Sequence, residues 1–104
     1  MFDAITEKDV LTVYEQLKNR YDLVLTTTGT LEGYSMDCPI VVGEANGLIV
    51  ELYAYEGDFI LDIKDAERTK GTHGHPLDVD DAIDWIVEFM EGKSDYILHP
   101  FRQV

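Results

Sequence analysis

The chain is poor in basic residues, in cysteine and in long apolar runs, and each shortage excludes a class of function. Eight Lys and Arg stand against 21 Asp and Glu, which gives a formal net charge of −13. A field of this sign repels nucleic acid and anionic membrane surfaces and attracts basic partners. We therefore expect no nucleic-acid or membrane partner. A basic protein is the partner that the charge favours, and a purely solubilising role of the acids is the alternative.

Signals for export and membrane insertion are also missing. The residues from Met1 to Ala4 show no basic stretch followed by an apolar one. No apolar run approaches the roughly 20 residues that a membrane-spanning helix needs. Cys38 is the only cysteine, so no intrachain disulfide can form, which fits a reducing compartment. The sequence predicts a single cytoplasmic domain over residues 1–104, large enough to form one core.

The charges are unevenly distributed along the chain. Residues 21–63 contain eight acids and no Lys or Arg, and residues 78–91 contain six acids and again no base. Between these two stretches, Lys64, Arg68 and Lys70 form the only local basic run. We expect these bases to pair with neighbouring acids rather than to bind an anion.

Two segments carry the signals of amphipathic helices. Thr6 is a suitable N-cap for a helix from Glu7 to about Arg20. Asp78 is a suitable N-cap for a second helix, which Gly92 would end at the C′ position. The apolar stripes are Val10, Val13, Tyr14, Leu17 and Tyr21 in the first helix, and Val79, Ala82, Ile83, Ile86, Phe89 and Met90 in the second.

The sequence between the helices predicts β-strands. Asn46-Gly47 and Glu56-Gly57 are two-residue turns of the kind that joins antiparallel strands into a meander. The expected strands are 23–28, a short strand around 31–35, and the meander strands 39–45, 48–55 and 59–63.

The two turns fix a register that divides the meander into two faces. One face carries no charge and predicts the core side: Val41, Leu48, Val50, Leu52, Ala54, Phe59, Leu61 and Ile63. The other face, here called the mixed face, consists of Ile40, Val42, Glu44, Ile49, Glu51, Tyr53, Tyr55, Ile60 and Asp62. We predict a binding surface there, formed by Glu44, Ile49, Glu51, Tyr53, Tyr55, Ile60 and Asp62. Coverage by a loop or the tail is the alternative.

Glu51 and Asp62 would be neighbours on the mixed face, so that the pKa of one of the two carboxyl groups would be raised.

The order of the elements predicts an α+β domain. It would contain an antiparallel sheet of four to five strands, a β-meander, with the N-terminal and C-terminal helices packed on one face. Trp85 lies off the centre of its helical stripe, so we expect it to pack at the edge of the core. The apolar tail 96–101 is expected to dock on the domain.

Two histidines stand one residue apart just before the second helix. His73, His75 and Asp78 are the candidate metal ligands, but no zinc-enzyme spacing is present, and a catalytic Zn²⁺ site needs three protein ligands. The two rings would point to one side only if Gly74 keeps the strand pleat. We therefore expect the histidines to hold this loop through hydrogen bonds, without a catalytic metal or another cofactor.

Together these features predict a small acidic protein-binding module of cytoplasmic bacterial type, without catalytic residues. It would hold a basic protein, as small inhibitory, immunity or chaperone-like proteins do. Two alternatives stay open. One is a small metal-dependent or acid/base enzyme built on His73 and His75. The other is a self-associating domain with the mixed face as its homodimer interface.

Overall fold

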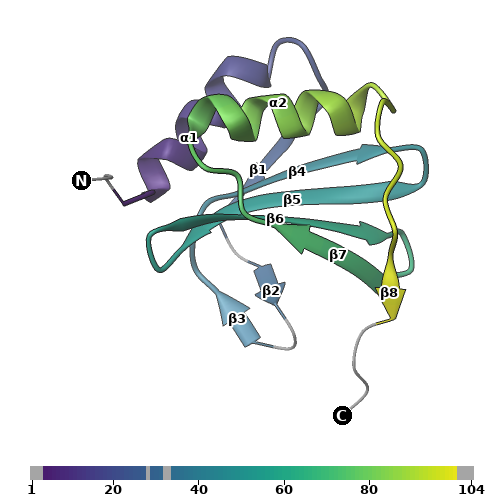
Figure 1. Ribbon diagram of the computed structural model, residues 1–104. Coiled ribbons are helices and arrows are strands. Elements are labelled where there is room, and N and C mark those ends of the chain that lie inside the picture. Colours follow the sequence, from purple (N-terminus) through teal and green to yellow (C-terminus); the bar gives the residue numbers. More distant parts are fainter. Residues whose placement is uncertain (1–3, 28, 32–33, 101–104) are drawn as a thin grey trace.

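A computed structural model describes residues 4–27, 29–31 and 34–100; the side chains of residues 29–31 and 34–36 are not described. Two helices, α1 (Glu7–Leu17) and α2 (Val79–Met90), lie on one face of an antiparallel sheet (Figure 1). The sheet has six strands in the order β1-β4-β5-β6-β7-β8. Their bounds are β1 (Val24–Thr26), β4 (Ile40–Ala45), β5 (Leu48–Tyr55), β6 (Asp58–Asp65), β7 (Lys70–Gly74) and β8 (His99–Pro100). The predicted α+β class, with both helices on one face, is confirmed.

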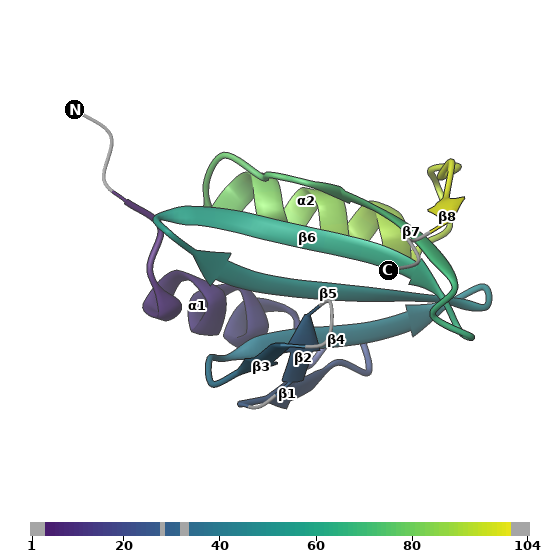
Figure 2. The ribbon, with the colours of Figure 1, turned by 90° about the horizontal axis from the view of Figure 1, so that it is seen from below.

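A separate hairpin lies on the other side of the sheet. Strands β2 (Gly29–Leu31) and β3 (Tyr34–Met36) pair antiparallel with each other. Figures 1 and 2 both place them on the side opposite the helices, and Figure 2 shows them across β4. The prediction of one strand around residues 31–35 is wrong, because the chain reverses direction within that stretch. Of the strand predicted over 23–28, the central part is present as β1, and Thr28 lies outside the described residues.

The meander has the predicted register. Every predicted cross-strand pair is present, with Leu52 at the centre of the three strands. Asn46 and Gly47 have φ values of 54° and 78°, and Glu56 and Gly57 have values of 50° and 85°. Positive φ at both central positions is the requirement of a type I′ turn, whose twist matches that of the strands it joins. Local turn chemistry therefore set the pairing of β4, β5 and β6.

The sheet contains more strands than the four to five expected. The segment around His73, expected to be a loop before the second helix, is instead part of β7, which pairs with β6. The turn before it is organised by Asp65, whose Oδ1 accepts hydrogen bonds from the N–H groups of Thr69 at 2.8 Å and Lys70 at 3.0 Å. The two glycines in this strand lower its β-propensity, which concealed it in the sequence.

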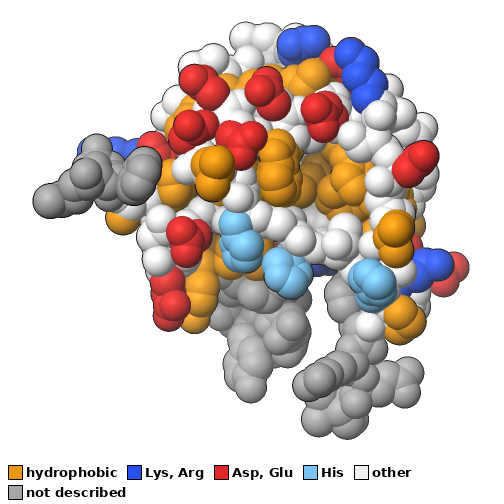
Figure 3. Space-filling view, in the orientation of Figure 1, with side chains coloured by type: hydrophobic (Ala, Val, Ile, Leu, Met, Phe, Trp, Pro, Cys, Tyr) orange, Lys and Arg blue, Asp and Glu red, His pale blue; other side chains and the backbone are white. Residues whose placement is uncertain are grey.

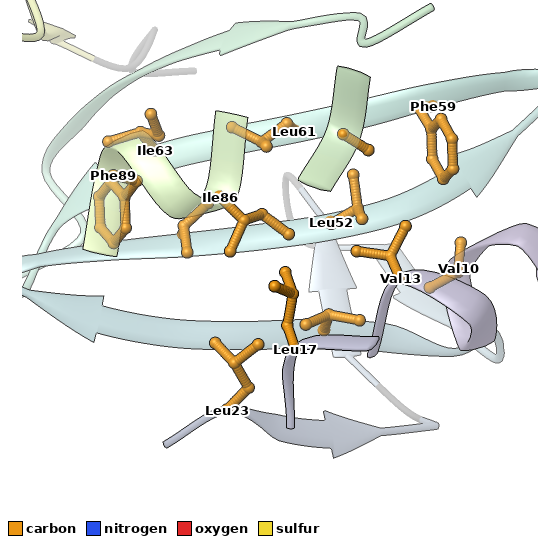
Figure 4. Packing of buried hydrophobic residues seen from close by; sticks show 13 residues of the cluster. Val10, Val13, Leu17, Leu23, Leu52, Phe59, Leu61, Ile63, Ile86 and Phe89 are labelled. Carbon is orange, nitrogen blue, oxygen red and sulfur yellow. The ribbon is translucent and has the colours of Figure 1, made fainter. Parts of the chain in front are cut away.

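The core lies between the sheet and the helices (Figure 4). The uncharged face of the meander forms its floor, as predicted. Leu52 and Phe59 of this face and Ile86 of α2 are fully buried. Gly43 allows the Leu23 side chain to approach β4 closely, since a Cβ at this position would stand 2.8 Å from Cδ2 of Leu23. The buried cluster consists of Val10, Val13, Leu17, Leu23, Val41, Val50, Leu52, Phe59, Leu61, Ile63, Ala82, Ile86 and Phe89.

The predicted capping residues of the two helices are confirmed, but the first helix is shorter than predicted. Thr6 and Asp78 occupy the two N-cap positions, and Gly92 ends the second helix with a φ of 67°. The helix α1 ends at Leu17, earlier than the expected Arg20, which lies in a turn. Among the described residues, no helix is long and apolar enough to span a membrane.

The segment after α2 docks on the domain, as predicted. Tyr96 and Leu98 pack against the core, and the Tyr96 ring centroid lies 5.9 Å from that of Phe89. The chain then pairs with β7 as β8. Phe101, the last residue of the predicted tail, lies outside the described residues.

Candidate functional site

The mixed face is partly covered by the chain itself. Ile40, Ile49 and Tyr53 are only 4%, 6% and 3% exposed, and the β2–β3 hairpin lies on this side of the sheet (Figure 2). Glu44 and Tyr55 are exposed. As a binding surface this face stays a prediction, but much of its apolar area is already buried within the chain. A partner would find mainly its charged and polar border.

An ionic cluster lies within the mixed face. The Lys64 ammonium is 2.5 Å from Glu51 Oε1, and Arg68 Nη1 is 3.6 Å from the same oxygen. Asp62 stands opposite Glu51 on β6, as predicted, and its Oδ2 accepts a 3.2 Å hydrogen bond from the Tyr53 hydroxyl. Burial raises the pKa of Asp62, against the opposing effect of the Lys64 charge. Burial and the Asp62 carboxylate also raise the pKa of Tyr53. Two bases of the basic run thus pair with an acid, as expected.

The two histidines lie together on β7 and just beyond it. The rings of His73 and His75 have centroids 5.7 Å apart, at an angle of 81°. Gly74 therefore keeps the pleat that places both rings on one side. His75 Nδ1 is 3.1 Å from the carbonyl oxygen of Phe59, a contact that anchors the segment to β6. Asp78 caps α2, and the described residues contain no group of three His, Cys, Asp or Glu placed to hold a metal.

Cys38 has the surroundings of an inert thiol. Its side chain is partly buried, and this burial raises the pKa of the thiol. The charges of Glu7 and Asp37 raise the pKa further. The thiolate is the nucleophilic form of cysteine, so these surroundings oppose a catalytic role.

A cavity opens between β7, α2 and the segment that follows α2. Its volume is about 280 Å³, and the backbone of the elements around it can be followed in Figure 1. Leu61 and Ile63 of β6 form its floor, while Trp85 and Tyr96 form apolar walls. Sites for drug-sized molecules usually measure about 300–1,000 Å³. The cavity is therefore suited to one bulky side chain rather than to a large cofactor.

One wall of the cavity depends on a glycine that lies beneath a tryptophan. A Cβ at Gly74 would stand 2.5 Å from Cζ3 and 2.7 Å from Cη2 of Trp85, so only glycine lets the indole lie against the edge of β7. Trp85 is partly buried and packs against the core, which confirms its expected place at the core edge. Its indole also lines the cavity, so it can contact a bound side chain.

Acidic side chains follow the exposed side of α2, and one of them, Glu88, lines the cavity. Asp80, Asp84 and Glu88 recur at intervals of four residues, and all three are exposed. Figure 3 shows acids gathered over α2, next to a hollowed apolar area. Like charges at this spacing destabilise a helix by about 0.2–0.5 kcal/mol per pair. The ion pairs found within the described ranges involve none of these three acids. The helix thus carries an electrostatic cost that a basic ligand would relieve.

These residues were not among those predicted to bind a partner. The spacing of the acids in α2 and the absence of bases near them were readable in the sequence, but the cavity beside them was not. Comparisons with protein-family models, curated protein sequences and solved structures give no match. The function is therefore inferred from the geometry of the chain alone.

Proposed function

We propose that this chain is a small acidic protein-binding module that captures a basic segment of another protein at the cavity between α2 and β7. The observation that carries the proposal is an apolar cavity lined by Glu88, on a helix whose exposed acids Asp80, Asp84 and Glu88 make no ion pair in the described part of the chain. A bulky apolar side chain would enter between Trp85 and Tyr96. Lys or Arg residues beside it would approach Asp80, Asp84 and Glu88. A cytoplasmic location, in keeping with the lone cysteine, belongs to the same proposal.

The expected affinity for a short segment is weak. Burying one large apolar side chain contributes about 1.5–3 kcal/mol. Three exposed ion pairs add about 0.2–1 kcal/mol each. The entropy lost on association offsets part of this total of about 2–6 kcal/mol, so the dissociation constant is expected to be no tighter than tens of micromolar. A complete partner would bind more tightly through further contacts. The acid border would mainly raise the association rate and make it sensitive to salt.

A second copy of this chain is a poor occupant of the cavity. Each copy carries a formal charge of −13, so docking two copies at the acid border of α2 would bring like charges together. Basic segments of another protein meet the opposite field. The charge pattern therefore favours a partner of different composition over self-association.

Tryptophan fluorescence provides a direct test, because Trp85 is the only tryptophan of the chain and lines the cavity. The probe is the synthetic peptide acetyl-Lys-Lys-Phe-Lys-Lys-amide, and its control has Ala in place of Phe. We expect the Phe peptide to change the fluorescence saturably, and the Ala peptide to bind at least about fivefold more weakly. Raising the salt from about 0.01 M to about 0.5 M should weaken the binding. Equal binding of the two peptides would refute the cavity as the anchor site.

Charge reversal identifies the surface that binds. Asp84→Lys changes an exposed acid on α2, and Glu44→Lys changes an exposed acid of the mixed face. We expect Asp84→Lys to weaken the binding of the Phe peptide by about fivefold or more, and Glu44→Lys to change it by less than about twofold. The reverse order would overturn the proposal in favour of the mixed face. Equal effects of the two substitutions would indicate non-specific charge attraction and would also overturn the proposal.

A further inference from the structure

We infer that the partner binds as an extended segment that adds a strand to the free edge of β7. This inference rests on the proposed function and specifies how the bound segment is held. On its outer side, β7 pairs with β8 only at Lys70 and Gly71. From Thr72 to Gly74, this side has no paired strand within the described ranges. The cavity opens at this unpaired part, since Thr72, His73 and Gly74 all line it.

The β7–β8 register shows which backbone groups face outward. Lys70 pairs with Pro100, which has no N–H, and Gly71 pairs with His99. In an antiparallel pair, rungs that exchange hydrogen bonds alternate with rungs that do not, so the Gly71–His99 rung is the one able to exchange them. His73 lies two residues after Gly71, so its N–H and C=O point to the same side of β7 as those of Gly71. At His73, this side is the open one. An added antiparallel strand would exchange its hydrogen bonds there.

Between α2 and β8, the chain lies away from this edge. Before β8, Leu98 and Tyr96 pack against the core instead of continuing the pairing with β7, and Ile97 is 78% exposed. Within the described residues, the position opposite His73 has no paired segment, so a partner strand can occupy it. Exposed strand edges of this kind are the usual docking sites for extended peptides, whose main chain supplies affinity and whose alternate side chains supply specificity.

Strand geometry predicts which side chains of the partner meet the cavity. Thr72 and Gly74 face the helix side of the sheet, because they pair with the core residues Ile63 and Leu61. A partner residue opposite either of them would point its side chain into the cavity. The Trp85 indole lies over Gly74, so a partner side chain opposite this position would pack against the indole. Partner residues two positions away would share this side and lie nearest the acids of α2. Along the partner strand, every second side chain is thus expected to be basic or apolar, and these side chains share the side that faces the cavity.

Two peptide isomers test this alternation. Acetyl-Lys-Thr-Phe-Thr-Lys-amide places both lysines on the side of the phenylalanine when it is extended, and acetyl-Thr-Lys-Phe-Lys-Thr-amide places them on the opposite side. Their composition and charge are identical. In titrations followed by Trp85 fluorescence, we expect the first isomer to bind at least about threefold more tightly. Equal binding of the two isomers would overturn strand addition while leaving the proposed function intact. Failure of both isomers and of the Lys-Lys-Phe-Lys-Lys peptide would overturn the proposed function itself.

Backbone methylation tests the hydrogen bonds directly. In the first isomer, a threonine next to phenylalanine would stand opposite His73 and direct its N–H toward β7, while the phenylalanine N–H would point away. N-methylation of both threonines should weaken the binding by about tenfold or more, and N-methylation of phenylalanine should change it by less than about threefold. In the parent protein, saturating peptide should slow hydrogen exchange of the His73 amide. Equal effects of the two methylations, or an unchanged exchange rate at His73, would overturn the inference.

Discussion

Replacing Lys64 by methionine tests whether the ionic cluster behaves as a buried charge pair. The Lys64 side chain is 10% exposed and that of Glu51 is 14% exposed. Methionine keeps most of the aliphatic stem, so the main loss is the positive charge beside Glu51. Breaking a buried ion pair by removing one partner costs about 3–5 kcal/mol. Arg68 still lies 3.6 Å from Glu51 Oε1, so we expect the lower end, about 3 kcal/mol. That is a large share of the about 5–15 kcal/mol typical of a small domain.

Urea unfolding, followed by Trp85 fluorescence and by circular dichroism, measures this loss. Arg68→Met is the matched control, because its side chain is 55% exposed and its pair with Glu51 should contribute less than about 1 kcal/mol. The double variant Lys64→Met/Glu51→Leu should regain most of the stability, since no uncompensated carboxylate remains at this position. A loss below about 1 kcal/mol for Lys64→Met, equal to that of Arg68→Met, would show that the pair is effectively solvated and would refute this reasoning.

Three further changes test the core, a turn and a titrating group. Leu52→Ala should lower the free energy of unfolding by about 2–5 kcal/mol, and a loss below about 1 kcal/mol in denaturant unfolding would contradict its central place. Gly47→Val should cost about 1–2 kcal/mol. Among the described residues beyond its chain neighbours, no atom lies within 4 Å of a Cβ at Gly47, so this cost would come from its φ of 78°, and an unchanged denaturant midpoint would contradict it. Because burial raises the folded-state pKa of Asp62, its contribution to stability is full below the unfolded value of about 3.9 and is lost as the pH rises through the higher folded pKa. Relative to Asp62→Asn, the parent should thus lose stability as the pH rises above about 4, and parallel stability curves would contradict this sign.

The candidate site could be read from the sequence only in part. The acids of α2 lie at intervals of four residues with no base nearby, and this pattern is visible in the chain. The cavity beside them is not, since it needs strand β7, helix α2 and the segment around Tyr96 to diverge from one another. Its wall also depends on Trp85 lying where Gly74 has no side chain. Residues far apart in sequence meet there, and no local spacing encodes that meeting.

The sequence by itself determined the elements whose signals are local. Cap residues and apolar spacing located both helices, and the turns at Asn46-Gly47 and Glu56-Gly57 fixed the register of the meander, because a type I′ turn leaves its two strands one way to pair. Only the tertiary structure decided that β7 joins the sheet, that much of the apolar area of the mixed face is buried, and that part of the β7 edge has no paired strand among the described residues. Each of these depends on a pairing or packing partner distant in sequence, and strand propensity is governed by such partners more than by the strand itself.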